Sequence, residues 1–315
     1  MKRKAIIISL SGFRLKQNEK KLIKTHKPWG IILFKRNIKS FNQAQKLISD
    51  IKKTIKDKNY PILIDEEGGN VCRLNNFVDN SIYSQNFFGN LYEKNEILTK
   101  YIYTNYINSL CAILKLLGIN INTVPVLDIL KEKTHKIIGS RSYSKNMKVI
   151  KKLAKICIKQ YKQNKISTVI KHIPGHGGSK SDSHLKLPKI NDTKKKLFKN
   201  DFKCFYKINS HFAMTAHILY SKIDKKNVVT HSREIIENII RKKLKFKGIL
   251  ISDDITMKSL KHDICTNALK ALNAGCNLAL YCSGNYNESL NLLKVIPQID
   301  KFTTKKTSEF YKFLS

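Results

Sequence analysis

The sequence predicts an α/β protein that folds as a single (β/α)8 TIM-type barrel, and three observations indicate this fold class. Short apolar runs rich in Ile, Val and Leu alternate along the 315 residues with longer segments of helical periodicity, as in parallel βαβ units. There are eight such runs, which suits a barrel, whereas a doubly wound sheet more often has about five to seven strands. The first run also lacks the Gly-x-Gly-x-x-Gly turn that a dinucleotide-binding sheet would carry.

The eight predicted strands are short and mostly apolar, as expected for strands buried on both faces of a parallel sheet. In chain order they are Lys4–Ser9, Gly30–Phe34, Pro61–Ile64, Ile121–Val126, Ser167–Ile170, Phe212–Ala216, Gly248–Ser252 and Asn277–Cys282.

Apolar residues in the intervening segments recur at intervals of three and four, and this spacing predicts helices. The clearest are Phe41–Ile55, Leu98–Leu117, Met147–Gln163, Arg233–Leu244 and Met257–Ala274. We expect residues 1–315 to form one domain, because the chain contains no Pro-, Gly- or Ser-rich linker and no internal repeat. The Lys-rich tail after about residue 298 is predicted to form a peripheral helix.

The composition argues against several classes of protein. Hydrophobic residues make up 42% of the chain, which is enough for a core and argues against disorder. No apolar run approaches the roughly 20 residues that a transmembrane helix needs, so no membrane partner is expected. The seven cysteines are scattered, odd in number and never spaced as Cys-x-x-Cys, which disfavours both a disulfide scaffold and a zinc module.

The N-terminus could be mistaken for a secretory signal, because basic residues precede the apolar stretch Ala5–Leu10. That stretch is very short, is not followed by a small-x-small cleavage site and runs straight into Gly12-Phe13-Arg14. A first buried strand is therefore the favoured interpretation. Together with the cysteine pattern, this predicts a cytoplasmic protein.

The chain is strongly basic, with 60 Lys and Arg against 23 Asp and Glu and a formal net charge of +37. Such an excess can indicate binding to nucleic acid. Only seven of the basic residues are Arg, however, and the lysines are spread along nearly every segment. Proteins that recognise nucleic acid usually favour Arg over Lys. A solvated Lys-rich surface is therefore the preferred interpretation, and no specific nucleic-acid partner is expected.

Glycine is scarce, yet five of the thirteen glycines fall in two short segments that begin where predicted strands end. A parallel barrel places its active site at these strand ends. The first segment runs from Asp65 through Gly68 and Gly69 to Arg73. A carboxylate with an Arg eight residues later could bind sugar hydroxyls or a substrate carboxylate, and an ordinary acidic turn is the alternative.

The second segment, Lys171–His184, contains three of the nine histidines in a predicted Gly- and Ser-rich loop, which argues against buried packing histidines. A metal site would need more ligands at compatible spacing. The pair Asp182 and His184 is better explained as a carboxylate that orients an imidazole for proton transfer.

A third segment, Gly248–Met257, carries Asp253 and Asp254 at the end of an apolar run. Either carboxylate could cap a following helix. One can do so while the other faces the pocket as a nucleophile for sugar transfer.

Taken together, these motifs closely resemble bacterial β-N-acetylglucosaminidases of glycoside hydrolase family 3, in the branch that recycles cell wall. The matching residues are Asp65-x-Glu67-Gly68-Gly69, Gly139-Ser140-Arg141-Ser142-Tyr143, Lys171-His172-x-Pro174-Gly175-His176-Gly177, Asp182-Ser183-His184 and Ser252-Asp253-Asp254. Weaker matches extend the resemblance over nearly the whole chain, at Gly30–Asn37, Val124–Asp128, Met214–His217 and Ala274–Asn277. Asn70 and Asn277 depart from the family pattern without removing a catalytic group.

The resemblance implies a single-domain barrel enzyme that removes N-acetylglucosamine from peptidoglycan-derived muropeptides with retention of configuration. It implies Asp253 as nucleophile and His184 as general acid/base, paired with Asp182. The implied sugar contacts are Asp65, Arg73, Arg141, Lys171 and His172. We expect no cofactor, no metal and a monomer.

The residues independently support one part of this assignment. Arg is the minority cation, yet Arg73 and Arg141 both fall in pocket motifs, where a bidentate guanidinium does what Lys cannot. Two alternatives remain at this point: a phosphorolytic enzyme of the same family, and a non-catalytic basic protein that binds nucleic acid or a wall polymer.

Overall fold

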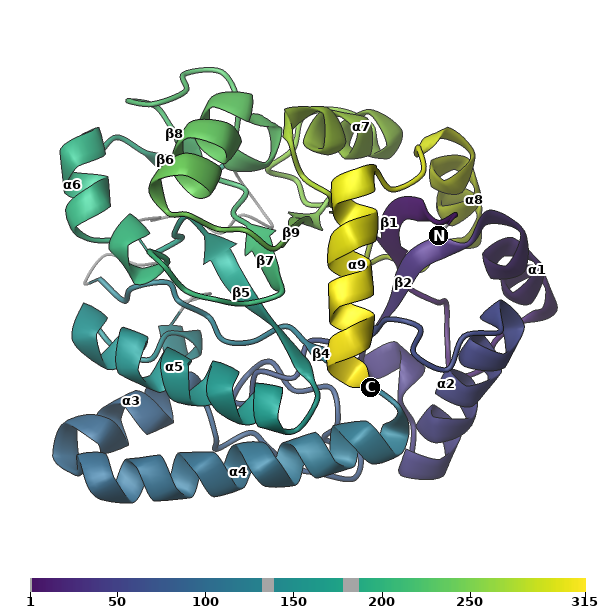
Figure 1. The fold of residues 1–315 in the computed structure, drawn as a ribbon, viewed down its shortest axis with the longest axis horizontal. Coiled ribbons are helices and arrows are strands. Elements are labelled where there is room, and N and C mark those ends of the chain that lie inside the picture. Colours follow the sequence, from purple (N-terminus) through teal and green to yellow (C-terminus); the bar gives the residue numbers. More distant parts are fainter. Residues whose placement is uncertain (1, 132–138, 178–186) are drawn as a thin grey trace.

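The computed structural model describes residues 2–131, 139–177 and 187–315, and its central feature is a closed barrel of eight parallel strands (Figure 1). Neighbouring strands follow chain order, and the last strand pairs with the first to close the barrel. The predicted (β/α)8 fold is confirmed. The barrel strands are β1 Lys4–Ile8, β2 Pro28–Leu33, β3 Ile62–Ile64, β4 Ile121–Asn122, β5 Ser167–Ile173, β7 Phe212–Thr215, β9 Ile249–Asp254 and β10 Leu278–Leu280.

Several strand bounds differ from the predicted ones: β2 begins earlier, at Pro28, β4 ends earlier, at Asn122, and two strands continue past their apolar runs. Strand β5 continues through Lys171 and His172 to Ile173, and β9 continues to Asp254. Ladder pairing persists in these extensions, where Ile173 pairs with Thr215 of β7. The prediction that Lys171 and His172 lie in a loop was therefore wrong. The apolar run stops where side chains begin to face the pocket, while the backbone pairing goes on.

The helices surround the barrel in chain order (Figure 1). They are α1 Gln17–His26, α2 Phe41–Ile55, α3 Gln85–Lys94, α4 Glu96–Leu117, α5 Met147–Gln163, α6 Lys194–Lys199, α7 Ile264–Ala274, α8 Tyr286–Val295 and α9 Lys301–Leu314. Both α2 and α5 have their predicted bounds, because Ser40 and Asn146 cap their first turns. A short parallel pair, β6 Lys189–Ile190 and β8 Leu219–Tyr220, lies outside the barrel. Within the described segments, no helix is both long enough and apolar enough to cross a membrane.

Helix α4 begins at Glu96, two residues before its predicted start, and two other predicted helices differ more from the structure. Residues 257–263 form turns rather than helix, and α7 begins only after Asp263, whose side chain accepts a hydrogen bond from the Thr266 amide. The segment predicted as Arg233–Leu244 is a π-helix over Ile235–Lys243. Periodicity of apolar residues does not separate a π-helix from an α-helix over so short a span.

The N-terminal end of the barrel is covered by helix α9, which crosses in front of the strands in Figure 1. Phe310 of α9 is fully buried, with its ring 5.3 Å from that of Phe212 at the start of β7. The indole Nε1 of Trp29, near the start of β2, donates to the Thr307 hydroxyl at 2.9 Å. Since α9 occupies this end, the opposite end of the barrel is the one that carries the candidate site.

Candidate active site

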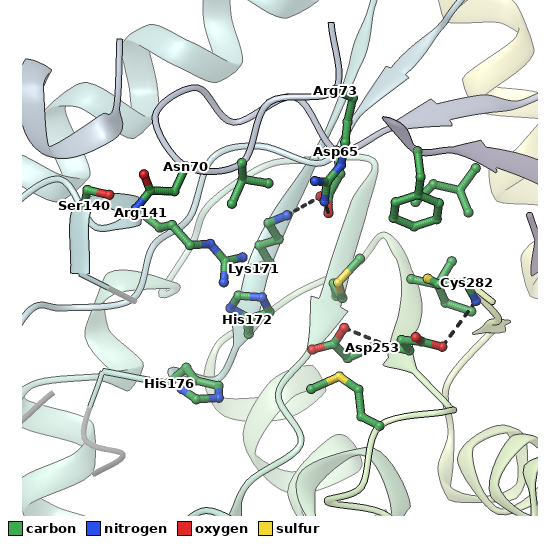
Figure 2. Close-up of a pocket in the computed structure, with 17 residues that line it drawn as sticks. Asp65, Asn70, Arg73, Ser140, Arg141, Lys171, His172, His176, Asp253 and Cys282 are labelled. Carbon is green, nitrogen blue, oxygen red and sulfur yellow. Dashed lines mark hydrogen bonds and ion pairs between the residues drawn. The ribbon is translucent and has the colours of Figure 1, made fainter. Parts of the chain in front are cut away.

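A cavity of about 350 Å³ opens at the C-terminal end of the barrel, among residues at or just beyond the ends of its strands (Figure 2). Six of the eight predicted site residues line it: Asp65, Arg73, Arg141, Lys171, His172 and Asp253. The other two, Asp182 and His184, lie outside the described residues. Side chains from separate strands and loops therefore meet in one place.

Lys171 is the centre of a buried ion-pair cluster on one wall of this cavity. Its Nζ atom lies 2.6 Å from Oδ1 of Asp65, 2.5 Å from Oε1 of Glu67 and 2.9 Å from the Thr123 hydroxyl. The side chain is only 2% exposed, so all three ammonium donors are used inside the protein. Asp65 also accepts a hydrogen bond from the Thr123 hydroxyl.

Two arginines complete the cluster. Arg73 Nη2 lies 3.2 Å from Asp65 Oδ2, and Arg141 holds Glu67 with Nε and Nη2 at 2.8 and 2.9 Å. Burial by itself would raise the pKa of both carboxyls, but Lys171 and these arginines outweigh it and hold the pKa of Asp65 and Glu67 below their usual values. Both carboxylates are therefore ionised and rigidly held at neutral pH.

Glu67 was not among the predicted site residues, although it belongs to the motif Asp65-x-Glu67-Gly68-Gly69. The turn after it depends on glycine, because Gly68 has a φ of +82° and an added Cβ would lie 2.2 Å from the Tyr83 carbonyl oxygen. The motif itself was the signal that could have identified Glu67.

Another buried carboxylate, Asp128, orients the His172 ring and holds the backbone of His176. Its Oδ2 lies 2.7 Å from Nδ1 of His172, and its Oδ1 accepts a 2.6 Å hydrogen bond from the His176 amide. His172 and His176 together lower the pKa of Asp128 against the effect of burial. The carboxylate is thus an acceptor only, so His172 carries its proton on Nδ1 and can present Nε2 to a ligand.

Asp128 was also missed as a site residue, although the resemblance includes the segment Val124–Asp128 at β4 and just beyond it. Burial lowers the pKa of the neighbouring His176 imidazole to about 4, so this ring is neutral at pH 7.

Asp253 lies near the end of β9, on the opposite side of the cavity from the Lys171 cluster (Figure 2). Its Oδ1 accepts a 2.8 Å hydrogen bond from the Asp254 amide. Burial raises the pKa of the Asp253 carboxyl, but nearby His217 and His172 oppose this effect and the net pKa is lowered. Asp253 is therefore ionised at neutral pH and lines the cavity, as a nucleophile must.

Asp254 has a different environment from its neighbour. Its carboxylate accepts hydrogen bonds from the amide and hydroxyl of Thr256 and from the Cys282 amide, and burial raises its pKa. It stabilises a turn, so the expectation that one of the two carboxylates caps a helix was wrong. Asp253 lines the cavity, as expected for the other carboxylate, but Asp254 lines it as well.

The cavity is thus a polar pocket at the mouth of a (β/α)8 barrel, with one ionised carboxylate across from a pre-formed cluster of carboxylates and cations. Within the described residues, no group of three or more His, Cys, Asp and Glu side chains is arranged to hold a metal ion. Carboxylates and guanidinium groups are well suited to bind sugar hydroxyls, and a buried carboxylate nucleophile is the group that glycosyl transfer uses. Fold and site together define a carbohydrate-processing barrel enzyme.

Comparison with known proteins identifies the family. The model for the glycosyl hydrolase family 3 N-terminal domain matches residues 3–307. A relative from Haemophilus influenzae named "Beta-hexosaminidase" is 32% identical over 301 residues, which cover 94% of this chain and 83% of that protein. The chain belongs to glycosyl hydrolase family 3 and is a glycoside hydrolase.

Solved structures agree with this assignment. The crystal structure of NagZ from Neisseria gonorrhoeae in complex with N-trifluoroacetyl-D-glucosamine matches with a TM-score of 0.88 and 26% identity, over 100% of this chain and 91% of that one. A family 3 β-N-acetylglucosaminidase from Paenibacillus sp. str. FPU-7 has the same fold, with a TM-score of 0.85 and 24% identity. That match covers 98% of this chain, which spans 60% of the longer Paenibacillus chain.

Proposed function

We propose that the protein is a retaining β-N-acetylglucosaminidase that releases N-acetylglucosamine from peptidoglycan-derived muropeptides. The observation that carries this proposal is the ionised Asp253 carboxylate in the cavity that also contains the Lys171 cluster. The name of the Haemophilus relative and the glucosamine derivative bound by the Neisseria protein support the choice of sugar.

The binding side of the site consists of Asp65, Arg73, Arg141, Lys171 and His172. Because Lys171, Arg141 and His172 are already held by Thr123, Glu67 and Asp128, little conformational entropy is lost when a sugar binds. We assign them to the hydroxyl and acetamido groups of the N-acetylglucosamine unit. The assignment is supported by their common cavity and by the resemblance of their motifs to the family.

Asp253 acts as nucleophile in this proposal. Its carboxylate oxygen forms a bond to the anomeric carbon while the bond from that carbon to the glycosidic oxygen breaks. Water then attacks the same carbon, releases the carboxylate and gives the sugar its original configuration. The lowered pKa of Asp253 supports this role, because the nucleophile must be ionised before attack.

His184, paired with Asp182, is assigned as the general acid that protonates the departing oxygen and as the base that activates water. This assignment rests on the family resemblance. An alkoxide leaving group needs protonation, whereas a nitrophenolate does not. Substitution H184A should therefore slow cleavage of a natural disaccharide by ~10²–10⁴-fold while affecting an aryl glycoside far less. An equal loss on both substrates would make His184 a binding residue.

The same proposal places the enzyme in the cytoplasm as a monomer without a cofactor. All seven cysteines are free thiols, which supports a reducing compartment. Cell fractionation with an activity assay tests the location, and light scattering tests the oligomeric state.

The direct test of the proposed activity compares two chromogenic substrates, an aryl β-N-acetylglucosaminide and the matching aryl β-glucoside. We expect turnover of the former to exceed that of the latter by orders of magnitude, since only the former carries the acetamido group. Equal turnover of both, or turnover of neither, would contradict the proposal.

A further inference from the structure

Three polar residues next to Asp253 are fully buried and have no role in the mechanism above. Thr215 ends β7, His217 follows it by two residues, and Thr230 lies in the short 3₁₀ turn Val229–His231. Each has a relative exposure of 0%. Buried polar side chains are costly unless each is paired, so their interactions require an explanation.

These side chains connect the two ends of the Asp253–Asp254 segment through hydrogen bonds. The Asp253 amide donates to the Thr215 hydroxyl at 3.4 Å, and the hydroxyl oxygens of Thr215 and Thr230 lie 2.8 Å apart. Nδ1 of His217 lies 2.7 Å from the Thr230 hydroxyl, and its Nε2 lies 3.0 Å from the Asp254 carbonyl oxygen. The path that leaves the backbone at Asp253 therefore returns to it at Asp254.

The direction of every hydrogen bond in this path follows from its end points. A carbonyl oxygen can only accept, so His217 carries its proton on Nε2 and Nδ1 is an acceptor. The Thr230 hydroxyl must then donate to Nδ1 and accept from the Thr215 hydroxyl. Thr215 in turn accepts from the Asp253 amide. Along this path each hydroxyl donates once and accepts once, which is the arrangement in which linked hydrogen bonds strengthen one another. The Thr230 hydroxyl also lies 3.4 Å from the Ala216 carbonyl oxygen, a longer contact than its 2.7 Å contact with His217.

The path requires a neutral His217, and its surroundings favour that state. Burial lowers the pKa of His217, although Asp253 and Asp254 of β9 act in the opposite direction. His172 of β5 acts in the same direction as burial, and His231 of the neighbouring turn is neutral near pH 7 because burial lowers its own pKa to about 4. A protonated ring would carry a hydrogen on Nδ1 and could no longer accept from Thr230.

We propose that Thr215, Thr230 and His217 form a positioning network that holds the backbone of Asp253 so that its carboxylate stays aligned with the anomeric carbon. The role rests on the proposed function, in which Asp253 is the nucleophile. None of the three touches the reacting atoms; they act through Asp253. Displacement of a nucleophile by about 1 Å can lower the reaction rate on the order of 10²-fold. Loss of the contacts that fix the Asp253 backbone should therefore be measurable as a lower rate.

The test compares Thr230→Val with Thr230→Ser in the full-length protein, using an aryl β-N-acetylglucosaminide. Valine removes the hydroxyl at similar volume, while serine keeps it. We expect T230V to lower kcat on the order of 10²-fold at nearly unchanged KM, and T230S to stay within about threefold of wild type. The KM is spared because the sugar contacts lie on the other side of the cavity.

The matched control is Thr307→Val, in the helix that covers the far end of the barrel. Thr307 is also fully buried, and its hydroxyl accepts from Trp29 and donates to the Thr303 carbonyl. T307V therefore costs similar stability without reaching Asp253, and its kcat should remain at the wild-type value. Wild-type kcat in T230V, or equal losses in T230V and T307V, would overturn the positioning role.

Failure of the proposed function gives a different result. If wild-type enzyme does not turn over the substrate, the proposed activity fails first and the positioning role fails with it. The network itself can be examined without activity, by ¹⁵N NMR of the His217 ring. We expect the hydrogen on Nε2 near neutral pH in wild type and T230S. A hydrogen on Nδ1 would overturn the path of hydrogen bonds described here.

Discussion

At the scale of single residues, the buried ion-pair cluster on one wall of the cavity depends on Lys171. This one ammonium group lies between two carboxylates that would otherwise repel each other inside the protein. Removal of one partner from a buried ion pair is costly because the other charge is left uncompensated. Lys171 is thus a structural counter-ion as well as an assigned sugar contact.

We therefore predict that Lys171→Met lowers the free energy of unfolding by about 3–5 kcal/mol and raises KM, as measured by urea unfolding and steady-state kinetics. The control is Lys46→Met, which breaks a pair with Asp50 in which the lysine side chain is 71% exposed. That change should cost about 1 kcal/mol or less. Equal costs for the two variants would show that the buried cluster adds no stability.

A second residue-scale prediction concerns pH. The pKa of His176 is lowered to about 4 by burial, whereas an unfolded histidine titrates near 6.5. Between these values the unfolded chain binds the proton and the folded chain does not, so acid favours unfolding. His176 should contribute a loss of about 1.4 kcal/mol per pH unit as the pH falls from 6.5 towards 4.

The measurement is the free energy of unfolding at several pH values for wild type and His176→Asn. We expect a shallower pH dependence in the variant over this window, while other buried histidines still contribute in both proteins. Superimposable slopes would mean that His176 is protonated equally in the folded and unfolded states.

Individual site residues were predicted to different degrees. Asp65, Lys171 and Asp253 could be found because each lies where an apolar run ends. Glu67 forms an ion pair with Arg141, which lies 74 positions further along the chain, and no local sequence pattern predicts such a contact. Motif resemblance supplied Arg141, whereas the pairing itself required the fold.

At the scale of secondary-structure elements, helix α9 determines which end of the barrel is closed. Its Phe310 packs against Phe212, and its Thr307 pairs with Trp29. The apolar contacts of Phe310 should stabilise the whole barrel, because they join the last helix to the starts of two strands.

Accordingly, Phe310→Ala should lower the free energy of unfolding by about 3–5 kcal/mol, as measured by chemical denaturation. Phe302 on the same helix is 40% exposed and provides the matched control. Its replacement by Ala should cost about 1 kcal/mol or less, including its contact with Arg241. If both substitutions had the same small effect, α9 would not be an integral part of the barrel.

The elements were predictable where burial alone determines them. All eight strands coincide with apolar runs, because the inner face of the barrel and the helices exclude water from both sides of each strand. Predictions failed where polar contacts determine an end: Asp263 delays the start of α7, and paired backbone extends β5 past its apolar run. Such contacts depend on residues brought together only by folding.

At the scale of the whole molecule, the protein carries a net charge of +37, and its site is assigned to anionic substrates. Muropeptides carry peptide carboxylates, so a basic protein should attract them at long range. Salt screens this attraction over a Debye length of about 8 Å at physiological ionic strength.

The corresponding prediction is that added salt lowers kcat/KM for an anionic muropeptide but leaves it unchanged for a neutral aryl β-N-acetylglucosaminide. Initial rates of both substrates across a salt series provide the measurement. Parallel salt dependence for the two would show that the charge has no part in substrate capture.

The proposed mechanism requires that Asp253 attacks the sugar and that the enzyme retains configuration. Proton NMR of the product released from an aryl β-N-acetylglucosaminide, recorded before the anomers equilibrate, tests it most directly. We expect β-N-acetylglucosamine as the first-formed anomer, together with loss of most activity in a normally folded Asp253→Asn variant. The α-anomer appearing first, or an Asp253→Asn variant as active as wild type, would contradict it.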